Sequence, residues 1–252
     1  MSKTQREAII EAMRGNGGYA TIGELYHKSV EIPDVTWKTK VPFASIRRIV
    51  QEINVSEERK AFVNLRTGLW ALREALPDLD FAAAARGEGD PDERQRFEHD
   101  YYQGLLVDIG NLQNFTTYVP PESRDNLFLG RPLGELMTTT TFHPFGYPDV
   151  VAKARTFDVV WFNGRKMPSA LLDVVAGEAF DDILLAFEAL QDYNGTLAVI
   201  AHQDRQNDLD AAHERTNLKE LRGRVAFWDY DYVEKLHEST ARLALMGHPM
   251  LF

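Results

Sequence analysis

Apolar residues recur at helical spacing along the first thirty positions and predict two short helices. The first begins near Thr4 and carries one apolar stripe, formed by Ile9, Ile10 and Met13. The second begins at Thr21, because a threonine followed three residues later by Glu24 has the spacing of a capping box. The first helix is therefore predicted from its apolar face and the second from its local start signal.

A third helix and a hairpin are predicted over the next forty positions. The helix follows Pro42, and its apolar stripe consists of Ile46, Ile49, Val50 and Ile53. The segment KAFVNLRTGLWAL then alternates apolar and polar residues around Gly68, which is typical of two strands joined by a tight turn. Together these elements predict a compact unit of three helices and a hairpin.

After residue 92 the pattern predicts an α/β domain, of the α+β kind, with a mixed sheet flanked by helices. A long amphipathic helix comes first, in PDERQRFEHDYYQGLLVDIG. Two short apolar strands follow, FDVVWF and SALLDVV, joined by an Asn-Gly-centred turn. A second helix, the strand TLAVIA and the strand–helix segment VAFWDYDYVEKL complete the order.

The composition changes between these two parts of the chain. Residues 76–92 are rich in proline, glycine and acidic residues, which interrupt regular structure and keep the segment solvated. We therefore expect one domain over residues 1–75, a linker over 76–92 and a second domain over 93–252.

Composition narrows the class of protein. Of the 252 residues, 44% are hydrophobic and 26% are charged, which is ordinary for a globular protein and argues against global disorder. The absence of cysteine excludes disulfides, thiolate zinc sites and cysteine nucleophiles, and it suits a reducing cytoplasm. The first ten residues lack the apolar core of a signal peptide, and no apolar run is long enough for a membrane span. We expect a cytoplasmic protein that has no membrane partner.

Charge is distributed unevenly along the chain. The net charge of −10 argues at first against a nucleic-acid partner. Residues 1–74, however, hold 12 Lys and Arg against 9 Asp and Glu, whereas the remainder holds 16 against 29. The basic residues are thus concentrated in the helical N-terminal part.

Three helices followed by a hairpin resemble a winged helix-turn-helix, and most of all the HARE-type module found at the front of some restriction endonucleases. The resemblance implies that the third helix enters the major groove of DNA and that the hairpin, as a wing, contacts the backbone. It places four DNA contacts on the helix and two on the wing, namely Ser45, Arg47, Arg48 and Gln51, with Lys60 and Arg66. A module that binds a partner protein is the alternative interpretation of the same charges.

Each of the two apolar strands carries one aspartate, Asp158 at the start of the first and Asp173 near the end of the second. In an antiparallel hairpin these positions meet, so both carboxylates can bind one ion, together with the backbone carbonyl of Val174. The order strand, strand, helix, strand resembles the core of the PD-(D/E)XK nuclease fold. The resemblance implies a DNA endonuclease in which the two aspartates bind Mg²⁺ or Mn²⁺ for phosphodiester hydrolysis.

The helix before these strands adds polar candidates. His99 and Gln103 are four residues apart and share one face, and this H-x-x-x-Q spacing resembles a pattern seen in a subset of the same nuclease family. The resemblance implies that Glu98, His99 or Gln103 supplies a metal ligand, or a contact to water or phosphate. Ordinary surface residues are the alternative interpretation for each of them.

The sequence departs from the nuclease pattern at Val175, where lysine or glutamate is usual. That lysine orients the attacking water and stabilises the transition state, so its loss removes a major catalytic contribution. Glu178, at the start of the next helix, and Lys166, in the hairpin turn, are the candidate replacements.

Two functions therefore remain open. The first is a Mg²⁺-dependent DNA endonuclease of restriction or phage-defence type, which acts on double-stranded DNA and cuts both strands as a homodimer. The second is a catalytically inactive nuclease-fold protein that binds DNA or a protein partner, as a regulator or as a subunit of a defence complex. The presence of both aspartates together with a predicted DNA-reading module favours the first function, and Val175 favours the second.

Overall fold

The structure, a computed structural model, describes residues 2–39, 42–52, 55–56, 59–177, 179–214 and 221–247. It divides into two compact units, one made of Met1–Asp90 with Glu234–Phe252 and the other of Pro91–Val233. None of the helices in the described ranges combines the length and the apolar character that crossing a membrane requires.

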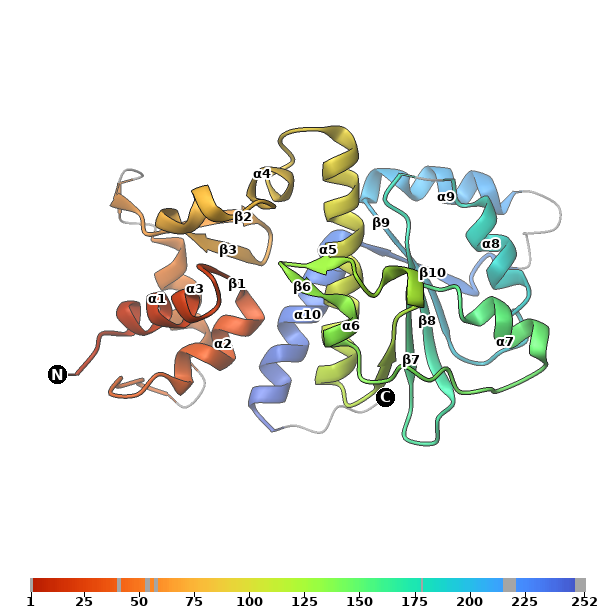
Figure 1. Cartoon of the computed structure of the whole chain (residues 1–252), viewed down its shortest axis with the longest axis horizontal. Helices are drawn as coiled ribbons and strands as arrows, with labels where there is room; N and C mark the ends of the chain where they lie inside the picture. The colour runs from red at the N-terminus through yellow and green to blue at the C-terminus, as the bar shows by residue number, and fades with distance from the viewer. Residues whose placement is uncertain are drawn as a thin grey trace. The chain divides into compact units, whose positions relative to one another are not determined.

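The first unit combines helices with a small antiparallel sheet (Figure 1). Its elements are α1 (Gln5–Gly15), β1 (Tyr19–Thr21), α2 (Ile22–Glu31), α3 (Phe43–Gln51), β2 (Phe62–Arg66), β3 (Leu69–Leu72), a 3₁₀ helix (Arg73–Asp78), α4 (Ala82–Ala85) and, from Glu234 on, α10 (Tyr230–Leu245). The strand order is β1-β3-β2, and both pairings are antiparallel. The sequence pattern did not indicate β1, because three residues are too few to show an alternation.

Local signals set the helix starts in this unit. The side chain of Thr4 accepts a hydrogen bond from the backbone N–H of Glu7, and Thr21 accepts one from Glu24; each glutamate bonds back to the capping residue's N–H. These capping boxes confirm the predicted starts of α1 and α2.

The core of this unit is formed by the apolar faces of its three N-terminal helices and the sheet. The buried residues include Ile9, Met13, Leu25, Tyr26, Phe43, Ile46, Val50, Phe62 and Leu72. Ile49 packs at the edge of this core, and Ile53 lies outside the described residues. The predicted inward stripe of α3 is therefore confirmed for Ile46 and Val50.

The second unit is a five-stranded mixed sheet flanked by helices, which confirms the predicted α/β class (Figure 1). The strand order is β10-β9-β8-β7-β4, antiparallel from β4 to β8 and parallel from β8 to β10. Its elements are α5 (Pro91–Leu112), β4 (Thr116–Tyr118), a 3₁₀ helix (Pro121–Ser123), β5 (Leu127–Phe128), β6 (Arg131–Pro132), α6 (Leu133–Leu136), α7 (Pro148–Ala154), β7 (Val159–Phe162), β8 (Pro168–Val174), α8 (Asp181–Glu188), β9 (Thr196–Ala201), a 3₁₀ helix (Gln203–Arg205), α9 (Gln206–His213) and β10 (Val225–Asp229).

The two faces of this sheet have different neighbours. On one face, Leu171 and Val175 share a buried core with Phe187 of α8 and with residues of α7 and α9. On the other face lies α5, where the indole Nε1 of Trp161 donates to the backbone carbonyl of Leu106 at 3.0 Å. Because side chains alternate along a strand, the side chains of β8 lie in turn on the α8 side and on the α5 side of the sheet.

The turn between β7 and β8 is a hairpin turn, as predicted, but the glycine is not its left-handed residue. Lys166 has φ 63°, and the turn is fixed by Asn163, whose side-chain Oδ1 accepts from the backbone N–H groups of Arg165 at 2.9 Å and Met167 at 3.1 Å. An asparagine that bonds to its own following backbone can set a turn without relying on glycine.

Candidate active site

A polar cluster lies where helix α5 faces the start of strand β7. His99 of α5 lies between two carboxylates: its Nε2 is 3.2 Å from Oδ2 of Asp158, and its Nδ1 is 3.2 Å from Oδ1 of Asp100. Asp158 directly precedes β7. The cluster therefore joins the helix to the sheet, and it contains two of the predicted site residues, His99 and Asp158.

The carboxylate of Asp100 is held from a distant segment. Asn126, just before β5, donates from Nδ2 to Oδ1 of Asp100 at 2.9 Å. Asp100 is 8% exposed, and a carboxylate this buried requires hydrogen-bond partners. Asn126, Asp100, His99 and Asp158 thus form a continuous chain of polar contacts.

The charge state of His99 follows from these neighbours. Burial opposes a charge on the ring, but the hydrogen bonds to Asp100 and Asp158 and the attraction of both carboxylates outweigh it and raise the pKa of His99 from 6.5 to about 10. Around neutral pH the metal-free protein therefore holds an imidazolium between two carboxylates.

Backbone contacts fix the position of Asp158. Its Oδ2 accepts a hydrogen bond from the backbone N–H of Val174 at 2.8 Å, and its carbonyl accepts one from Nε2 of Gln103 at 2.8 Å. Gln103 is fully buried, one helical turn after His99, and its Oε1 has no hydrogen-bond partner within the described ranges. Oδ1 of Asp158 accepts no hydrogen bond from a described residue, so that oxygen is available to a ligand.

Glu98 does not belong to the cluster. It is half-buried, and it forms no hydrogen bond or ion pair with His99, Asp100 or Asp158. The sequence placed Glu98, His99 and Gln103 together as candidates, and the structure brings only His99 and Gln103 to Asp158.

Asp173 lies next to Asp158 along the strand ladder, but the two carboxylates have different neighbours. The register pairs Val159 with Leu172, so the aspartates flank that pair. The side chain of Asp173 lines a cavity of about 290 Å³ together with Val175 and with Asp182 and Ile183 of α8. Asp158 instead contacts α5. No group of three or more His, Cys, Asp or Glu side chains suited to a metal ion occurs in the part of the chain that the structure describes.

The candidate replacements for the missing lysine have different outcomes. Val175 is 1% exposed and belongs to the core of the sheet. Lys166 lies in the turn at the opposite end of the hairpin from Asp158, about 16 Å away at the rise of a strand, so it cannot reach the cluster. The interpretation of Lys166 as a substitute was therefore wrong. Glu178 lies outside the described residues.

A cavity of about 470 Å³ opens beside His99. Gln95, Arg96 and Asp100 of α5, Asn126 and Ala176, which follows β8, are among its lining residues. Arg96 is exposed and forms no ion pair with a described residue. The cavity therefore exposes His99 to a ligand beside the guanidinium of Arg96 and the carboxylates of Asp92 and Asp100.

In the first unit, two of the predicted DNA contacts are ion-paired to helix α10. Arg47 of α3 bonds to Glu238, and Nε of Arg66 at the end of β2 lies 3.3 Å from Oε1 of Glu234. Glu238 also accepts a hydrogen bond from the hydroxyl of Tyr26 at 2.7 Å. The sequence analysis did not foresee this helix as a partner of the predicted DNA-binding face.

The other four predicted DNA contacts differ in their exposure. Arg48 and Gln51 are exposed on α3, whereas Ser45 is half-buried. Lys60 is half-buried before β2, and its carbonyl accepts from Nε of Arg73 at 2.9 Å. Arg48 and Gln51 are thus the helix residues most open to a ligand.

Sequence reasoning missed Asp100, Asn126 and Arg96. Arg96 lies three residues before His99 and four before Asp100, and both spacings place side chains side by side on a helix, so a search for polar neighbours of Arg96 could have found this group. Asn126 lies in an irregular segment with no pattern that points to α5. Only the tertiary structure brings it to Asp100.

Comparison with known proteins adds a family to this geometry. Neither a curated protein nor a solved structure matches the chain. Residues 80–250 match the family model described as the type II restriction enzyme NmeDI C-terminal domain. That match covers α5, the complete five-stranded sheet and the His99–Asp158 cluster, which is more than half of the chain. The chain therefore belongs to the family of the type II restriction enzyme NmeDI C-terminal domain and is a restriction-enzyme-like protein.

Proposed function

We propose that this chain is a Mg²⁺-dependent DNA endonuclease of restriction type, with its cleavage site at the Asp158 end of the β7–β8 hairpin. One observation carries the proposal: in a chain of a restriction-enzyme family, the Asp158 carboxylate is held by the Val174 N–H and by His99 and keeps Oδ1 available. The element order supports it, because a helix, three antiparallel strands, a helix and a parallel strand form the arrangement expected of a PD-(D/E)XK core.

The donor chemistry at this edge of the sheet fits a hard divalent cation. Carboxylates and backbone carbonyls are the ligands that Mg²⁺ and Mn²⁺ accept, and we assign Asp158, Asp173 and the carbonyl of Val174 to the ion. When bound, the cation polarises the phosphate and lowers the pKa of the attacking water. The side chain of Asp173 lines the cavity beside α8, and Asp158 is the carboxylate that contacts α5.

The remaining residues hold this carboxylate in place and receive the substrate. His99 and the Val174 N–H orient the carboxylate of Asp158, and Gln103 fixes its backbone. Arg96, which lines the cavity beside His99, is suited to contact a phosphate of the substrate strand. A buried valine at position 175 supplies no charge, so Arg96 is the cation that we assign to the substrate.

DNA is selected, in this proposal, by the first unit acting as a winged helix-turn-helix. Three helices and a three-stranded antiparallel sheet support that assignment, and Arg48 and Gln51 of α3 are exposed to a ligand. Arg47 and Arg66 contact DNA only if they exchange their glutamate partners for phosphates. Ser45 and Lys60 complete the proposed contact surface.

Cleavage assays test the proposal directly. A panel of unmodified, methylated and hydroxymethylated duplexes is incubated with Mg²⁺ or Mn²⁺ and with the native protein, Asp158→Asn, Asp173→Asn or the control Asp192→Asn. Asp192 is exposed and lies in sequence well after both Asp158 and Asp173. Metal-dependent cutting that is lost in the first two variants and kept in the control supports the proposal. Sedimentation of the cutting form tests whether it is a homodimer.

A catalytically inactive protein that binds DNA or a protein partner is the second candidate. The burial of Val175 and the pairing of Asp158 with an internal histidine favour it. DNA binding without cutting of any duplex, at any concentration of Mg²⁺ or Mn²⁺, would select this candidate over the nuclease.

A further inference from the structure

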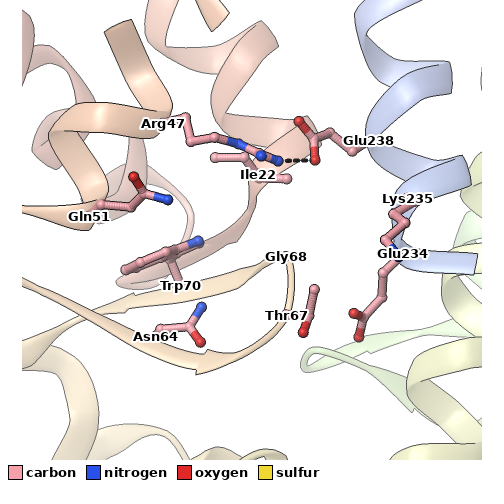
Figure 2. Close-up of a pocket in the computed structure, with 10 residues that line it drawn as sticks. All are labelled: Ile22, Arg47, Gln51, Asn64, Thr67, Gly68, Trp70, Glu234, Lys235 and Glu238. Atoms are coloured by element: carbon pink, nitrogen blue, oxygen red, sulfur yellow. Dashed lines mark hydrogen bonds and ion pairs between the residues drawn. The ribbon is translucent and has the colours of Figure 1, made fainter. Parts of the chain in front are cut away.

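A second cavity, of about 470 Å³, lies entirely within the first unit. Its walls come from three elements: helix α3, the β2–β3 hairpin and the part of α10 that belongs to this unit. Figure 2 shows Gln51, Asn64 and Trp70 gathered on one side of the cavity, with the Arg47–Glu238 pair across from them. A cavity of this size falls within the range of roughly 300–1,000 Å³ that is usual for small-molecule sites.

The α10 wall of this cavity is an integral part of the unit. Glu238 is bonded to both Arg47 and the buried Tyr26. Nε2 of His27 lies 2.9 Å from the carbonyl oxygen of Ala241, and a Cβ added at Gly23 would lie 3.0 Å from the Cβ of Ala241. Such close helix packing defines the cavity without a ligand, which lowers the ordering cost of binding.

The side facing α10 offers an aromatic ring with hydrogen-bonding groups around it. Trp70 and Asn64 are direct partners across the hairpin, so their side chains share one face of it. The Nδ2 of Asn64 is used within the hairpin, by the carbonyls of Arg66 at 2.8 Å and Leu69 at 3.3 Å, which leaves its Oδ1 as an acceptor. Gln51 is exposed, and its amide bonds to no residue in the described ranges.

The charges around the cavity indicate a neutral ligand. Two cations, Arg47 and Lys235, and two anions, Glu234 and Glu238, line it. Arg47 is already paired with Glu238, and Glu234 with Arg66. A phosphate group in the cavity would meet two carboxylates and cations that are already engaged, so a free anion is disfavoured. A flat, neutral ring with donors and acceptors on its edge carries no such penalty.

We propose that this cavity binds a single nucleobase that has swung out of a DNA strand, stacked on Trp70 and hydrogen-bonded on its edge by Gln51 and Asn64. Aromatic stacking with amide contacts to the base edge is the chemistry that holds extrahelical bases. The inference rests on the proposed function, because α3 and the hairpin are the elements assigned to DNA there. It adds a site for an unpaired base to a module otherwise expected to read paired ones.

The test uses the full chain labelled with 5-fluorotryptophan, with the Trp70 resonance identified by the variant Trp70→Phe. Two duplexes of the same sequence are titrated, one fully paired and one with a single bulged adenine, and adenosine is titrated separately. Gln51→Leu keeps the size of an exposed side chain and removes its amide, so its folding is not in question. Arg48→Ala, on the same helix but outside the cavity, is the matched control.

The expected result is a shift of the Trp70 resonance by the bulged duplex and an affinity for it about tenfold above that for the paired duplex. Gln51→Leu removes most of this preference, whereas Arg48→Ala weakens both duplexes equally. Equal affinities with an unmoved Trp70 resonance overturn the cavity assignment and leave the proposed DNA binding intact. If neither duplex binds, the proposed function fails; a Trp70 shift with adenosine then still supports the base site, and no shift overturns it.

Discussion

Nε2 of His99 lies 3.2 Å from Oδ2 of Asp158, and this contact ties the long helix α5 to the first of the two central strands. The same carboxylate oxygen accepts the N–H of Val174, so strand β8 is joined to the pair as well. A single carboxylate thus links three elements of the sheet domain. The stability of the sheet domain and the proposed metal binding therefore both depend on the carboxylate of Asp158.

The His99 ion pair predicts a pH-dependent stability of the metal-free protein. The pKa of His99 is raised from 6.5 to about 10 in the folded state, so its contribution is fully present below pH 6.5 and is lost as the pH rises through about 10. Urea denaturation at pH 6.5 and pH 10 should differ by on the order of a few kcal/mol. The variant His99→Gln should reduce that difference, and an unchanged difference would contradict the ion pair.

Asn126 supports the buried carboxylate of Asp100, and its removal should destabilise the protein. Asn126→Ala leaves Asp100 without one donor and is expected to lower the free energy of unfolding by about 1–3 kcal/mol. Asn126→Asp keeps the shape and adds a like charge, so it should be the more harmful change at pH 7 and the gap should narrow in acid. Thermal denaturation of the native protein and both variants, at pH 7 and in acid, measures these differences. Equal melting temperatures of the native protein and Asn126→Ala would argue against the contact.

Gly104 allows α5 to approach the β5 segment closely. A Cβ added there would lie 2.2 Å from Cδ2 of Phe128, so Gly104→Ala should cost roughly 1–3 kcal/mol despite the better helix propensity of alanine. Gly164→Ala is the control, because nothing lies within 4 Å of its added Cβ. Chemical denaturation of both variants compares them, and similar stabilities would show that Phe128 moves aside freely.

Glu238 restrains a proposed DNA contact, and neutralising it should change how DNA binding depends on salt. Glu238→Gln weakens the pair with Arg47, and the freed guanidinium can then neutralise one more phosphate. The slope of log affinity against log salt concentration should become steeper by about 1. Glu31→Gln, an exposed glutamate at the end of α2, should leave the slope unchanged. A slope that does not respond to Glu238→Gln would remove Arg47 from the DNA-binding surface.

Arg96 is the cation assigned to a substrate phosphate, so its loss should weaken substrate binding. Arg96→Ala is expected to raise KM several-fold with a smaller effect on kcat, as for a contact made in both the ground state and the transition state. Arg165→Ala, an exposed cation in the β7–β8 turn, is the control. Unchanged KM in Arg96→Ala, with cleavage intact, would exclude Arg96 from the substrate site.

The sequence by itself determined the features that depend on near neighbours. The capping boxes at Thr4 and Thr21 start α1 and α2, and short apolar runs mark β7 and β8, because these signals act over a few neighbouring residues. The shared position of His99 and Gln103 could also be predicted, because their spacing places both on one helical face, and both contact Asp158. Element order and the α/β class follow from such local patterns.

The tertiary structure alone decided which distant residues meet. Asn126 contacts Asp100, and Glu238 contacts Arg47 across 191 positions of the chain. No sequence pattern near any of these four residues indicates its partner. The face taken by Asp173 likewise depends on which helix covers each side of β8. The alternation of side chains along a strand predicts which residues share a face of the sheet. Which face becomes a site depends on the helices that pack against it, because spacing along the chain does not encode the proximity of distant segments in space.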